Sequence, residues 1–399
     1  MLVAGAGPAG SVTATLLARA GFSVVLVDRA SFPRDKACSE YMSPEAVRIL
    51  ARLGVLESLE RSGAFPLEGM KLFGPRGATA HGKFAGAGTP FRPTGLSVSR
   101  RILDHELLAA ARAAGARVLE RTSIEELLYD EGGVVAGAVM LNRRTQQRHC
   151  VKARLTVGAD GLRSLVARRL GPRRQGARRR IAFVAHVTGV AEMTASAELH
   201  FGEHGYIGLN QIGHDQTNVA LVVPADRVVD ARGGIERFFD QTLGDFPQVR
   251  DRVRAGEVVR RILATGPFAV RSSRIVAHGA MLVGDAADFF DPATGDGIYS
   301  ALRGAELVAS TATEALGRPG LVTVDRLIEY PRARHKVFAA KWLLERILDQ
   351  ALRFPRLFDR GVSRLGQRSG MADTLIGFAG GSVPPREVLN PSFLVRMLV

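Results

Sequence analysis

The sequence is short of cysteine and of long apolar runs, and each shortage excludes a class of protein. Its cysteines, Cys38 and Cys150, are too few for a disulfide framework, and neither has the spacing to a partner that a metal site needs. No apolar run reaches the roughly 18 residues that span a bilayer. The N-terminal stretch MLVAGAGPAG lacks the charged segment and the cleavage site of a signal peptide. The sequence therefore predicts a cytoplasmic protein that holds no metal.

Acidic residues are also scarce relative to basic ones. The chain has 54 Lys and Arg against 39 Asp and Glu, a formal net charge of +15. Arginines gather in Arg173–Arg180 and again in Arg332–Arg368. A nucleic-acid partner is not expected, because the aromatic or groove-reading modules that would accompany such charge are absent. Two interpretations stay open: an arginine-rich surface without a ligand, and attraction to anionic lipid or to an acidic substrate.

The N-terminus carries the pattern of a nucleotide-binding βαβ unit. Leu2–Ala4 predicts a strand, Ser11–Ala20 a helix of small residues, and Phe22–Val27 a second, continuously apolar strand. The first strand is short for its type, as if a few residues preceding it were missing. Between strand and helix lies GAGPAG (Gly5–Gly10), which fits G-x-G-x-x-G, and Asp28 follows the second strand.

This turn has a physical reason for each glycine. Gly5 allows the tight turn, Gly7 lets the backbone approach a pyrophosphate, and Gly10 lets the helix pack on the strand. The helix N-terminus then attracts the phosphate charge. Asp28 is placed to bind ribose hydroxyls, and its charge would repel a 2′-phosphate. The expected nucleotide is therefore FAD or NAD rather than NADP.

Two later turns repeat the strand–acid–helix arrangement. The buried strand Leu155–Ala159 leads into the turn ADGLRS around Asp160. The strand Ala280–Val283 leads into GDAADFFDPATGDG (284–297), rich in Asp and Gly, before a helical pattern resumes. Acidic, glycine-rich turns of this kind do not help packing, but they suit the binding of a polar ligand that contacts the backbone at a helix N-terminus.

In this order the three turns resemble the fingerprints of the FAD-dependent aromatic hydroxylase superfamily, and within it the geranylgeranyl reductase-like branch. The resemblance covers nearly the whole chain. It implies non-covalent FAD, with Asp285 on the ribityl chain and 295–297 at the flavin pyrimidine, and NAD(P)H as a transient electron donor. Arg100 matches a family arginine that approaches the cofactor, although a surface salt bridge to Asp104 is an alternative. The residues expected to bind the cofactor are Gly5, Gly7, Pro8, Ala9, Gly10, Asp28, Arg29, Arg100, Asp160, Gly284, Asp285, Pro292, Gly295, Asp296, Gly297 and Ile298.

The same resemblance implies a substrate pocket. Cys38 and Glu40 lie in a segment that crosses near the flavin, where Cys38 is either a pocket thiol or a plain buried cysteine. FGEHGYIG, beginning at Phe201, resembles the strand that walls the pocket. His204 and Tyr206 are its candidates for hydrogen bonding or proton transfer.

The fold class expected is α/β: a Rossmann-type FAD-binding domain with a parallel sheet, an inserted antiparallel β substrate domain and a helical C-terminal region. The alternation of apolar and polar residues over Ile181–Val223 indicates the antiparallel sheet. The expected boundaries are 1–75, 101–172 and 276–325 for the FAD-binding domain, 76–100 and 173–275 for the substrate domain, and 326–399 for the C-terminal helices and tail.

The motifs are compatible with three functions. Monooxygenation of an apolar or aromatic, polyketide- or isoprenoid-like molecule needs a dry, well-shaped cavity. Reduction of a prenyl or conjugated double bond needs a proton source, such as Tyr206. A flavoprotein used only for electron transfer or binding would have no use for a pocket. Ser39-Glu40, where reductases of the branch usually have Gly, favours monooxygenation. The missing W-x-W-x-I-P element argues against the halogenase relatives.

The C-terminal segment from Val337 to Phe358 has helical periodicity, and two interpretations of it stay open. One is a helix packed on the substrate domain. The other is a lid that docks on anionic membrane to collect an apolar substrate. The apolar positions are Val337, Ala340, Leu344, Ile347, Leu348 and Ala351, and the charged ones are Lys341, Arg346, Arg353 and Arg356.

Overall fold

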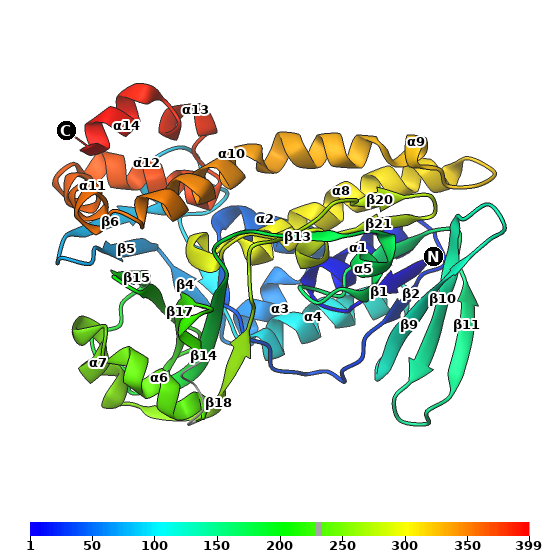
Figure 1. Ribbon diagram of the computed structural model, residues 1–399, viewed down its shortest axis with the longest axis horizontal. Helices are drawn as coiled ribbons and strands as arrows, with labels where there is room; N and C mark the ends of the chain where they lie inside the picture. The colour runs from blue at the N-terminus through cyan, green and yellow to red at the C-terminus, as the bar shows by residue number, and fades with distance from the viewer. Residues whose placement is uncertain (229–233, 399) are drawn as a thin grey trace.

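A six-stranded sheet lies at the centre of the nucleotide-binding part. The structure is a computed structural model that describes residues 1–228 and 234–398 (Figure 1). The strands are β1 (Leu2–Ala4), β2 (Val25–Val27), β8 (Arg117–Leu119), β12 (Thr156–Gly158), β20 (Val276–Ala277) and β21 (Ala280–Leu282). Their order is β20-β21-β12-β1-β2-β8, and only β20 pairs antiparallel with its neighbour. All three predicted turns therefore leave the sheet at the carboxyl ends of parallel strands, where α/β proteins bind ligands.

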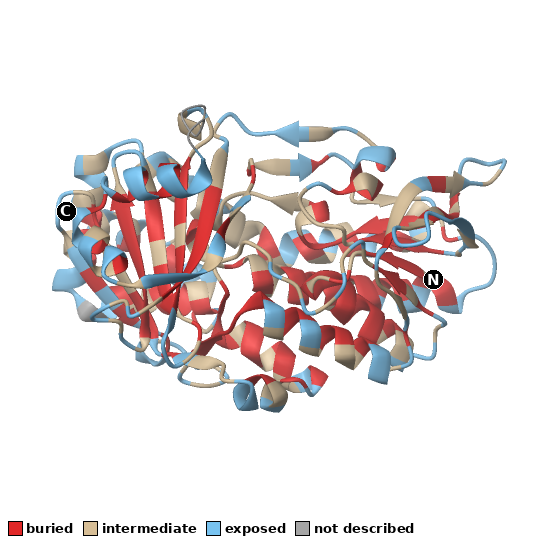
Figure 2. Ribbon diagram, turned by 90° about the horizontal axis from the view of Figure 1, so that it is seen from below, coloured by how far each residue is buried: buried red, intermediate tan, exposed pale blue. Residues whose placement is uncertain are grey.

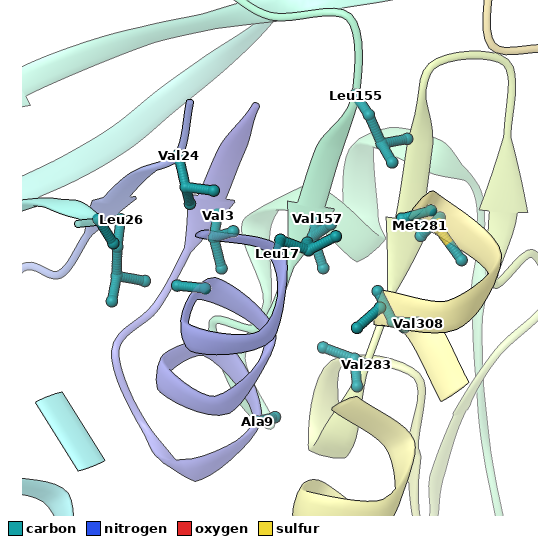
Figure 3. Close-up of a cluster of buried hydrophobic side chains, with 14 of the residues drawn as sticks. Val3, Ala9, Leu17, Val24, Leu26, Leu155, Val157, Met281, Val283 and Val308 are labelled. Atoms are coloured by element: carbon teal, nitrogen blue, oxygen red, sulfur yellow. The ribbon is translucent and has the colours of Figure 1, made fainter. Parts of the chain in front are cut away.

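Helices α1 (Pro8–Arg19), α4 (Arg100–Ala113) and α8 (Gly297–Gly317) accompany this sheet. Figure 3 shows the core that α1 and α8 form with the strands, in which Val3, Leu17, Val157 and Val308 are completely buried. Helix α1 begins at Pro8, three residues before the predicted start. Proline suits the first helical position, since its missing N–H would be unpaired there anyway. The turn consequently ends directly in a helix N-terminus.

A second, seven-stranded sheet confirms the antiparallel sheet predicted from the alternating pattern. Its strands are β18 (Glu257–Thr265), β14 (Arg180–Thr188), β17 (Gln216–Pro224), β16 (Gly205–Gln211), β15 (Ser196–Gly202), β5 (Gly69–Phe73) and β6 (Thr79–Lys83), in that order. Every pair is antiparallel except β15 with β5. The predicted fold class, a parallel-sheet FAD-binding unit with an antiparallel insertion and C-terminal helices, is confirmed.

The central strands β14, β15, β16 and β17 of the seven-stranded sheet are buried on both faces (Figure 2). Alternate residues such as Phe183 and Leu221 pack on α6 (Ile235–Leu243) and α7 (Pro247–Arg254). Because side chains alternate along a strand, their neighbours Ala182 and Val222 face the opposite side, towards the nucleotide-binding part. This inner face forms a wall of the candidate site.

The domain boundaries stay a prediction, and one pairing bears on them. β5 lies within the segment 1–75 expected for the FAD-binding domain, yet it pairs with β15 of the seven-stranded sheet. The two strands that flank the turn 130–133 belong to a three-stranded sheet, while residues 117–119 belong to the six-stranded sheet. The three strands are β9 (Thr122–Tyr129), β10 (Val135–Asn142) and β11 (Arg148–Lys152).

Shorter elements connect these layers. Two small sheets consist of β3 (Tyr41–Met42), β7 (Gly95–Ser97) and β4 (Phe65–Leu67), and of β13 (Arg173–Gln175), β19 (Val270–Ser272) and β22 (Asp288–Phe289). The short helices are α2 (Pro44–Leu53), α3 (Leu56–Arg61), α5 (Leu165–Leu170), and the 3₁₀ turns η1 (Phe84–Gly86), η3 (Gly284–Ala286) and η4 (Pro292–Thr294).

The C-terminal region is helical, as predicted. It consists of α9 (Val324–Leu327), α10 (Glu329–Ala351), α11 (Pro355–Gln367), α12 (Ser369–Gly380), α13 (Pro385–Val388) and α14 (Pro391–Leu398). Helix α10 runs alongside α8, and its predicted apolar positions Ala340, Leu344 and Leu348 pack on the protein (Figure 1). In the part of the chain that the structure describes, no helix has the length and apolarity needed to cross a membrane.

Candidate functional site

A cavity of about 790 Å³ connects the ends of the central strands with the inner face of the seven-stranded sheet. Its lining gathers residues from all three predicted turns. The predicted residues on its wall are Gly5, Gly7, Pro8, Ala9, Asp28, Arg29, Cys38, Arg100, Asp160, Tyr206, Gly284, Asp285, Pro292, Gly295, Gly297 and Ile298. The other predicted residues, Gly10, Glu40, Phe201, His204 and Asp296, do not line it.

The three glycines of the first turn are required for three different reasons. Gly5 has a φ of +95°, and a Cβ there would lie 2.5 Å from the Ala159 carbonyl oxygen. A Cβ at Gly10 would lie 1.8 Å from the carbonyl oxygen of Gly5, so the helix can approach the turn only with glycine. Gly7 has an ordinary φ of −73°, and a Cβ there would meet nothing closer than two guanidinium nitrogens at 3.7 and 3.8 Å. Gly7 alone is needed for space in the cavity rather than for the fold.

Those two guanidinium groups belong to Arg34 and Arg100. Asp104, which is completely buried, binds both: Arg100 at 2.7 Å and Arg34 at 3.2 Å. Burial opposes the charge of Arg100, but Asp104 outweighs it and raises the pKa of Arg100 above its usual value. The pair Arg100–Asp104 is thus buried, which corrects the alternative of a surface salt bridge. Two fixed cations beside a helix N-terminus form a site for a phosphate group.

Sequence reasoning missed Arg34 and its neighbour Lys36, although both stand in the segment that was singled out for Cys38. Lys36 also lines the cavity. Burial, and then the nearby charge of Arg100, lower the pKa of Lys36, whereas the charge of Asp285 raises it. The signal available in the sequence was two cations within three residues, close to the predicted pyrophosphate turn.

Asp28 closes the glycine turn as well as lining the cavity. Its two carboxylate oxygens accept the backbone N–H groups of Ala6 and Ala30, each at 2.8 Å. Each oxygen has a further lone pair, so the carboxylate can still accept hydroxyl groups of a ligand. Binding of ribose by Asp28 stays a prediction that this geometry permits.

The Asp160 side chain stabilises the second turn. Its carboxylate accepts the hydroxyl of Ser164 and the backbone N–H of Leu165 at 2.7 Å, at the start of α5. Burial raises the pKa of Asp160, and these hydrogen bonds oppose the rise. Its position on the cavity wall is as predicted, but its oxygens hold the helix N-terminus that leaves the turn.

The third turn contains four Asp residues, and only one of them faces the cavity. Asp285 lines it, and Arg173 fixes the Asp285 backbone by donating to its carbonyl oxygen at 3.1 Å. Among the described residues, none donates a hydrogen bond to the Asp285 carboxylate. A carboxylate oriented by its backbone and left without a protein donor is suited to accept hydroxyl groups of a ligand.

The other three acids each hold a cation from another part of the chain. Asp288 binds Arg334, Asp291 binds Arg180, and Asp296 binds Lys341 at 2.8 Å. Arg334 and Lys341 both belong to α10. The acidic turn is therefore clamped from outside by a C-terminal helix, which the sequence pattern did not indicate. The Asp296 side chain therefore pairs with Lys341 and does not line the cavity, while the role of 295–297 at the cofactor stays a prediction.

The glycines of the third turn make room for neighbouring groups. Gly295 has a φ of +67°, and a Cβ there would lie 2.7 Å from the ring of Tyr41. Gly284 has a φ of +60°, and a Cβ there would lie 3.0 Å from the Ala9 side chain. Gly297 and Ile298 follow on the cavity wall as the first turn of α8, whose N-terminus is thereby directed at the site.

Glu345 of α10 lies close to these acids and accepts the hydroxyl of Thr294 at 3.3 Å. Burial raises the pKa of Glu345 to about 8, and the charges of Asp296, Asp291 and Asp288 add to the rise. A carboxyl whose pKa is higher folded than unfolded weakens the fold progressively as pH rises from about 4.5 to about 8.

We therefore expect Glu345→Gln to stabilise the protein at pH 8 but not at pH 4.5. The amide keeps the neutral form that the folded protein favours, so the gain in unfolding free energy at pH 8 is about 1–3 kcal/mol. Urea denaturation at the two pH values measures it. An equal effect of the substitution at both pH values would contradict the assignment.

The two predicted proton-transfer residues lie in different environments. Tyr206 is buried on the cavity wall, and its hydroxyl donates to Asp291 at 2.6 Å. Burial and then the charge of Asp291 raise the pKa of Tyr206 well above its usual value. His204 lies in the exposed turn between β15 and β16, off the cavity wall, so the expectation of a catalytic histidine is wrong. His204 and Tyr206 are only two residues apart, but His204 lies in the hairpin turn and Tyr206 lies on β16, so their side chains have different surroundings.

Two of the three predicted pocket residues also lie off the wall. Glu40, completely buried, accepts the backbone N–H of Arg100 at 2.8 Å and contacts His186 at 2.7 Å. Phe201 packs on Tyr206 and Phe358 behind the wall. Cys38 does line the cavity. Glu40 and Phe201 support the pocket rather than forming its surface.

Comparison with known proteins decides which nucleotide the three turns bind. The model of the FAD binding domain family matches residues 1–341. The chain belongs to this family. The geometry fits FAD: an open glycine turn beside the guanidinium groups of Arg34 and Arg100 for the pyrophosphate, an unshared Asp285 carboxylate for hydroxyl groups, and a helix N-terminus at 297 for the flavin ring.

Relatives of known name place the chain among FAD-dependent oxidoreductases. It is 30% identical over 371 residues to menaquinone reductase of Mycolicibacterium smegmatis, covering 89% of this chain and 85% of that protein. It is 26% identical over 325 residues to digeranylgeranylglycerophospholipid reductase 1 of Methanococcoides burtonii, covering 80% and 75%. The flavin-dependent brominase Bmp2 has a similar structure, with a TM-score of 0.83 over 99% of this chain and 98% of that one, at 19% identity. That likeness shows the fold alone.

We expect the FAD to be bound without a covalent link. Cys38 is the cysteine on the cavity wall, and its sulfur is already an acceptor for the backbone N–H of Glu40 at 3.3 Å. Cys150 is exposed on β11. Acid precipitation of the yellow protein should release all flavin into the supernatant. Flavin that stays in the washed pellet would show a covalent link.

Proposed function

We propose that this oxidoreductase is an NAD(P)H-dependent monooxygenase that hydroxylates or epoxidises an apolar or aromatic, polyketide- or isoprenoid-like small molecule. The observation that carries the proposal is the apolar inner face of the seven-stranded sheet, which forms the wall opposite the nucleotide turns. Its contributions from four neighbouring strands are Ala182, Val184, Leu199, Gly208, Ala220 and Val222. Such a wall excludes water and binds an apolar molecule beside the flavin.

One polar side chain on this wall is available to orient a substrate. Asn210 is buried, and its amide nitrogen has no hydrogen-bond partner in residues 1–228 and 234–398. An unpaired buried donor costs free energy unless a ligand satisfies it. A substrate with one carbonyl or hydroxyl oxygen on an otherwise apolar body would accept from Asn210, and this contact would fix which carbon faces the flavin.

The arrangement of proton donors supports monooxygenation. The reaction inserts one atom of O₂ into the substrate, and the other leaves as water with two electrons from NAD(P)H and protons from NAD(P)H and solvent. The bound flavin supplies the oxygen and electron chemistry, so the protein has to position the substrate and keep the cavity dry. The Tyr206 hydroxyl donates its hydrogen bond to Asp291, and its raised pKa makes it a poor acid. His204 lies outside the cavity.

A second candidate is reduction of a prenyl or conjugated double bond. Two relatives at 30% and 26% identity are named for such substrates, a menaquinone and a digeranylgeranyl lipid. Ser39-Glu40, which replaces the glycine usual in reductases of the branch, does not favour either reaction, because Glu40 is buried and does not line the cavity. Reduction would need a proton from Cys38, Lys36 or solvent in addition to a hydride.

Product mass distinguishes the two reactions. The FAD-loaded protein is given NADH or NADPH with menaquinone or geranylgeraniol, once under isotopically labelled dioxygen and once without dioxygen. Monooxygenation predicts a product that carries one labelled oxygen atom and no product without dioxygen. A product that has gained two hydrogen atoms without dioxygen would replace the proposal by the second candidate. No product from any prenylated or aromatic probe would contradict the substrate class.

A further inference from the structure

The second half of α10, the turn after it and the start of α11 expose large apolar side chains among arginines. Phe354 is 59% exposed, Leu343 45% and Leu357 42%. Exposed arginines accompany them in sequence, one three residues after Leu343 and three within four residues of Leu357. The set, which we call the 343–360 surface, consists of Leu343, Arg346, Arg353, Phe354, Arg356, Leu357 and Arg360. It differs from the apolar stripe predicted from the sequence, which packs inward.

The charge of this surface is not balanced locally. The acids of the same stretch are each engaged inside the protein. Asp349 binds Arg178 and Arg180, and Asp359 accepts the backbone N–H of Arg76 at 2.9 Å. Glu345 has a pKa raised to about 8 by burial and is mainly uncharged near neutral pH. The four exposed arginines therefore form a field of one sign.

The segment that carries the 343–360 surface also packs on the apolar part of the cavity wall from behind. Leu348, Leu352 and Phe358, on the inner side of the same turn, pack on the cluster that contains Tyr206 and Val222. Phe358 contacts Phe201 at 4.6 Å between ring centroids, and Phe201 contacts Tyr206 at 5.8 Å. Apolar contacts thus lead from Phe358, next to the exposed Leu357 in sequence, to Tyr206 on the cavity wall.

We infer that the 343–360 surface docks on the face of an anionic lipid bilayer, with Phe354 and Leu357 inserted among the acyl chains and the arginines at the phosphates. Exposed Phe and Leu side chains can enter the acyl region of a membrane interface, while the arginines beside them pair with the anionic headgroups. Resting on the proposed function, the docked turn separates the bilayer from the cavity wall and is the place where an apolar substrate enters.

Vesicle co-sedimentation tests the docking without any turnover, so its outcome does not depend on which reaction the protein catalyses. The FAD-loaded protein is mixed with vesicles of phosphatidylcholine, with or without phosphatidylserine. Binding should require phosphatidylserine and fall with salt, because the attraction is screened over about 10 Å at 0.1 M. Arg353→Gln with Arg356→Gln should weaken binding about thirtyfold, and Phe354→Ser with Leu357→Ser at least about tenfold.

Matched variants on other surfaces control for net charge and apolarity. Arg61→Gln with Arg144→Gln removes the same charge from exposed positions elsewhere, and Leu321→Ser with Val259→Ser removes exposed apolar groups of similar size. Both controls should bind as wild type does. Equal weakening by the charge control, or full binding by the Phe354→Ser/Leu357→Ser variant, would overturn docking by insertion. Absence of binding to phosphatidylserine vesicles at low salt would also overturn it.

Discussion

Gly7→Val should remove FAD binding while the protein stays folded. The backbone at Gly7 is extended, with a φ of −73°, so valine adopts it without strain. The added side chain would project between the turn and the guanidinium groups of Arg34 and Arg100, where the pyrophosphate is expected. FAD affinity should fall roughly hundredfold or more, equal to about 2.7 kcal/mol. Flavin fluorescence titration of the apoprotein measures the loss, and circular dichroism checks the fold.

Two other glycines make this test specific. Gly10→Ala should destabilise the fold itself, since its Cβ would lie 1.8 Å from the Gly5 carbonyl oxygen. At Gly213 a Cβ meets nothing within 4 Å and the backbone is unstrained, so Gly213→Val should change neither property. If Gly7→Val bound FAD as tightly as Gly213→Val, the pyrophosphate would not lie on this turn.

Asp285→Ala should weaken FAD binding strongly and leave the stability of the apoprotein almost unchanged. The carboxylate faces the cavity without a protein donor among the described residues, so its removal strands no protein group. Each hydrogen bond from a ribityl hydroxyl to this carboxylate contributes about 1.5–3 kcal/mol, so affinity should fall by about tenfold to 150-fold per bond lost.

Asp288→Ala is the matched control in the same turn. Asp288 pairs with Arg334, whose side chain is 4% exposed, so its loss leaves a buried guanidinium without its carboxylate. Unfolding free energy should then fall by about 3–5 kcal/mol. The two acids, three residues apart, should thus show opposite patterns in FAD titration and urea denaturation. Equal effects of both substitutions on FAD affinity would contradict the division of roles.

The nucleotide half of the site could be predicted because its physics is local. A strand, a glycine turn and a helix N-terminus are contiguous in sequence, so the spacing of Gly5, Gly7 and Gly10 is enough to predict the role of each. The same holds for Gly284 and Asp285, which follow a buried strand directly. A carboxylate and a glycine at the end of a parallel strand rarely serve a purpose other than binding a ligand.

The clamp around the third turn could not be predicted in this way. Asp296 and Lys341 are 45 residues apart, and their pairing depends on α10 lying alongside α8. Periodicity alone assigned Lys341 to a charged surface. His204 was misplaced for a related reason, because a hairpin turn of two residues moves a side chain from the wall to solvent. Pairing between distant elements depends on how the elements pack, and the residue pattern within one element gives no information about that packing.

The measurement that tests the site most directly is titration of the FAD-loaded protein with geranylgeraniol, followed by the flavin absorption spectrum. Gly208 lies on the apolar wall, and a Cβ there would meet Leu199 at 3.7 Å, so phenylalanine would fill the cavity without disturbing the strand. The wild type should show a saturable change in the flavin band, and Gly208→Phe, with FAD bound normally, should show none. A spectral change that survives in Gly208→Phe, or its absence in the wild type, would contradict an apolar site between the flavin and the seven-stranded sheet.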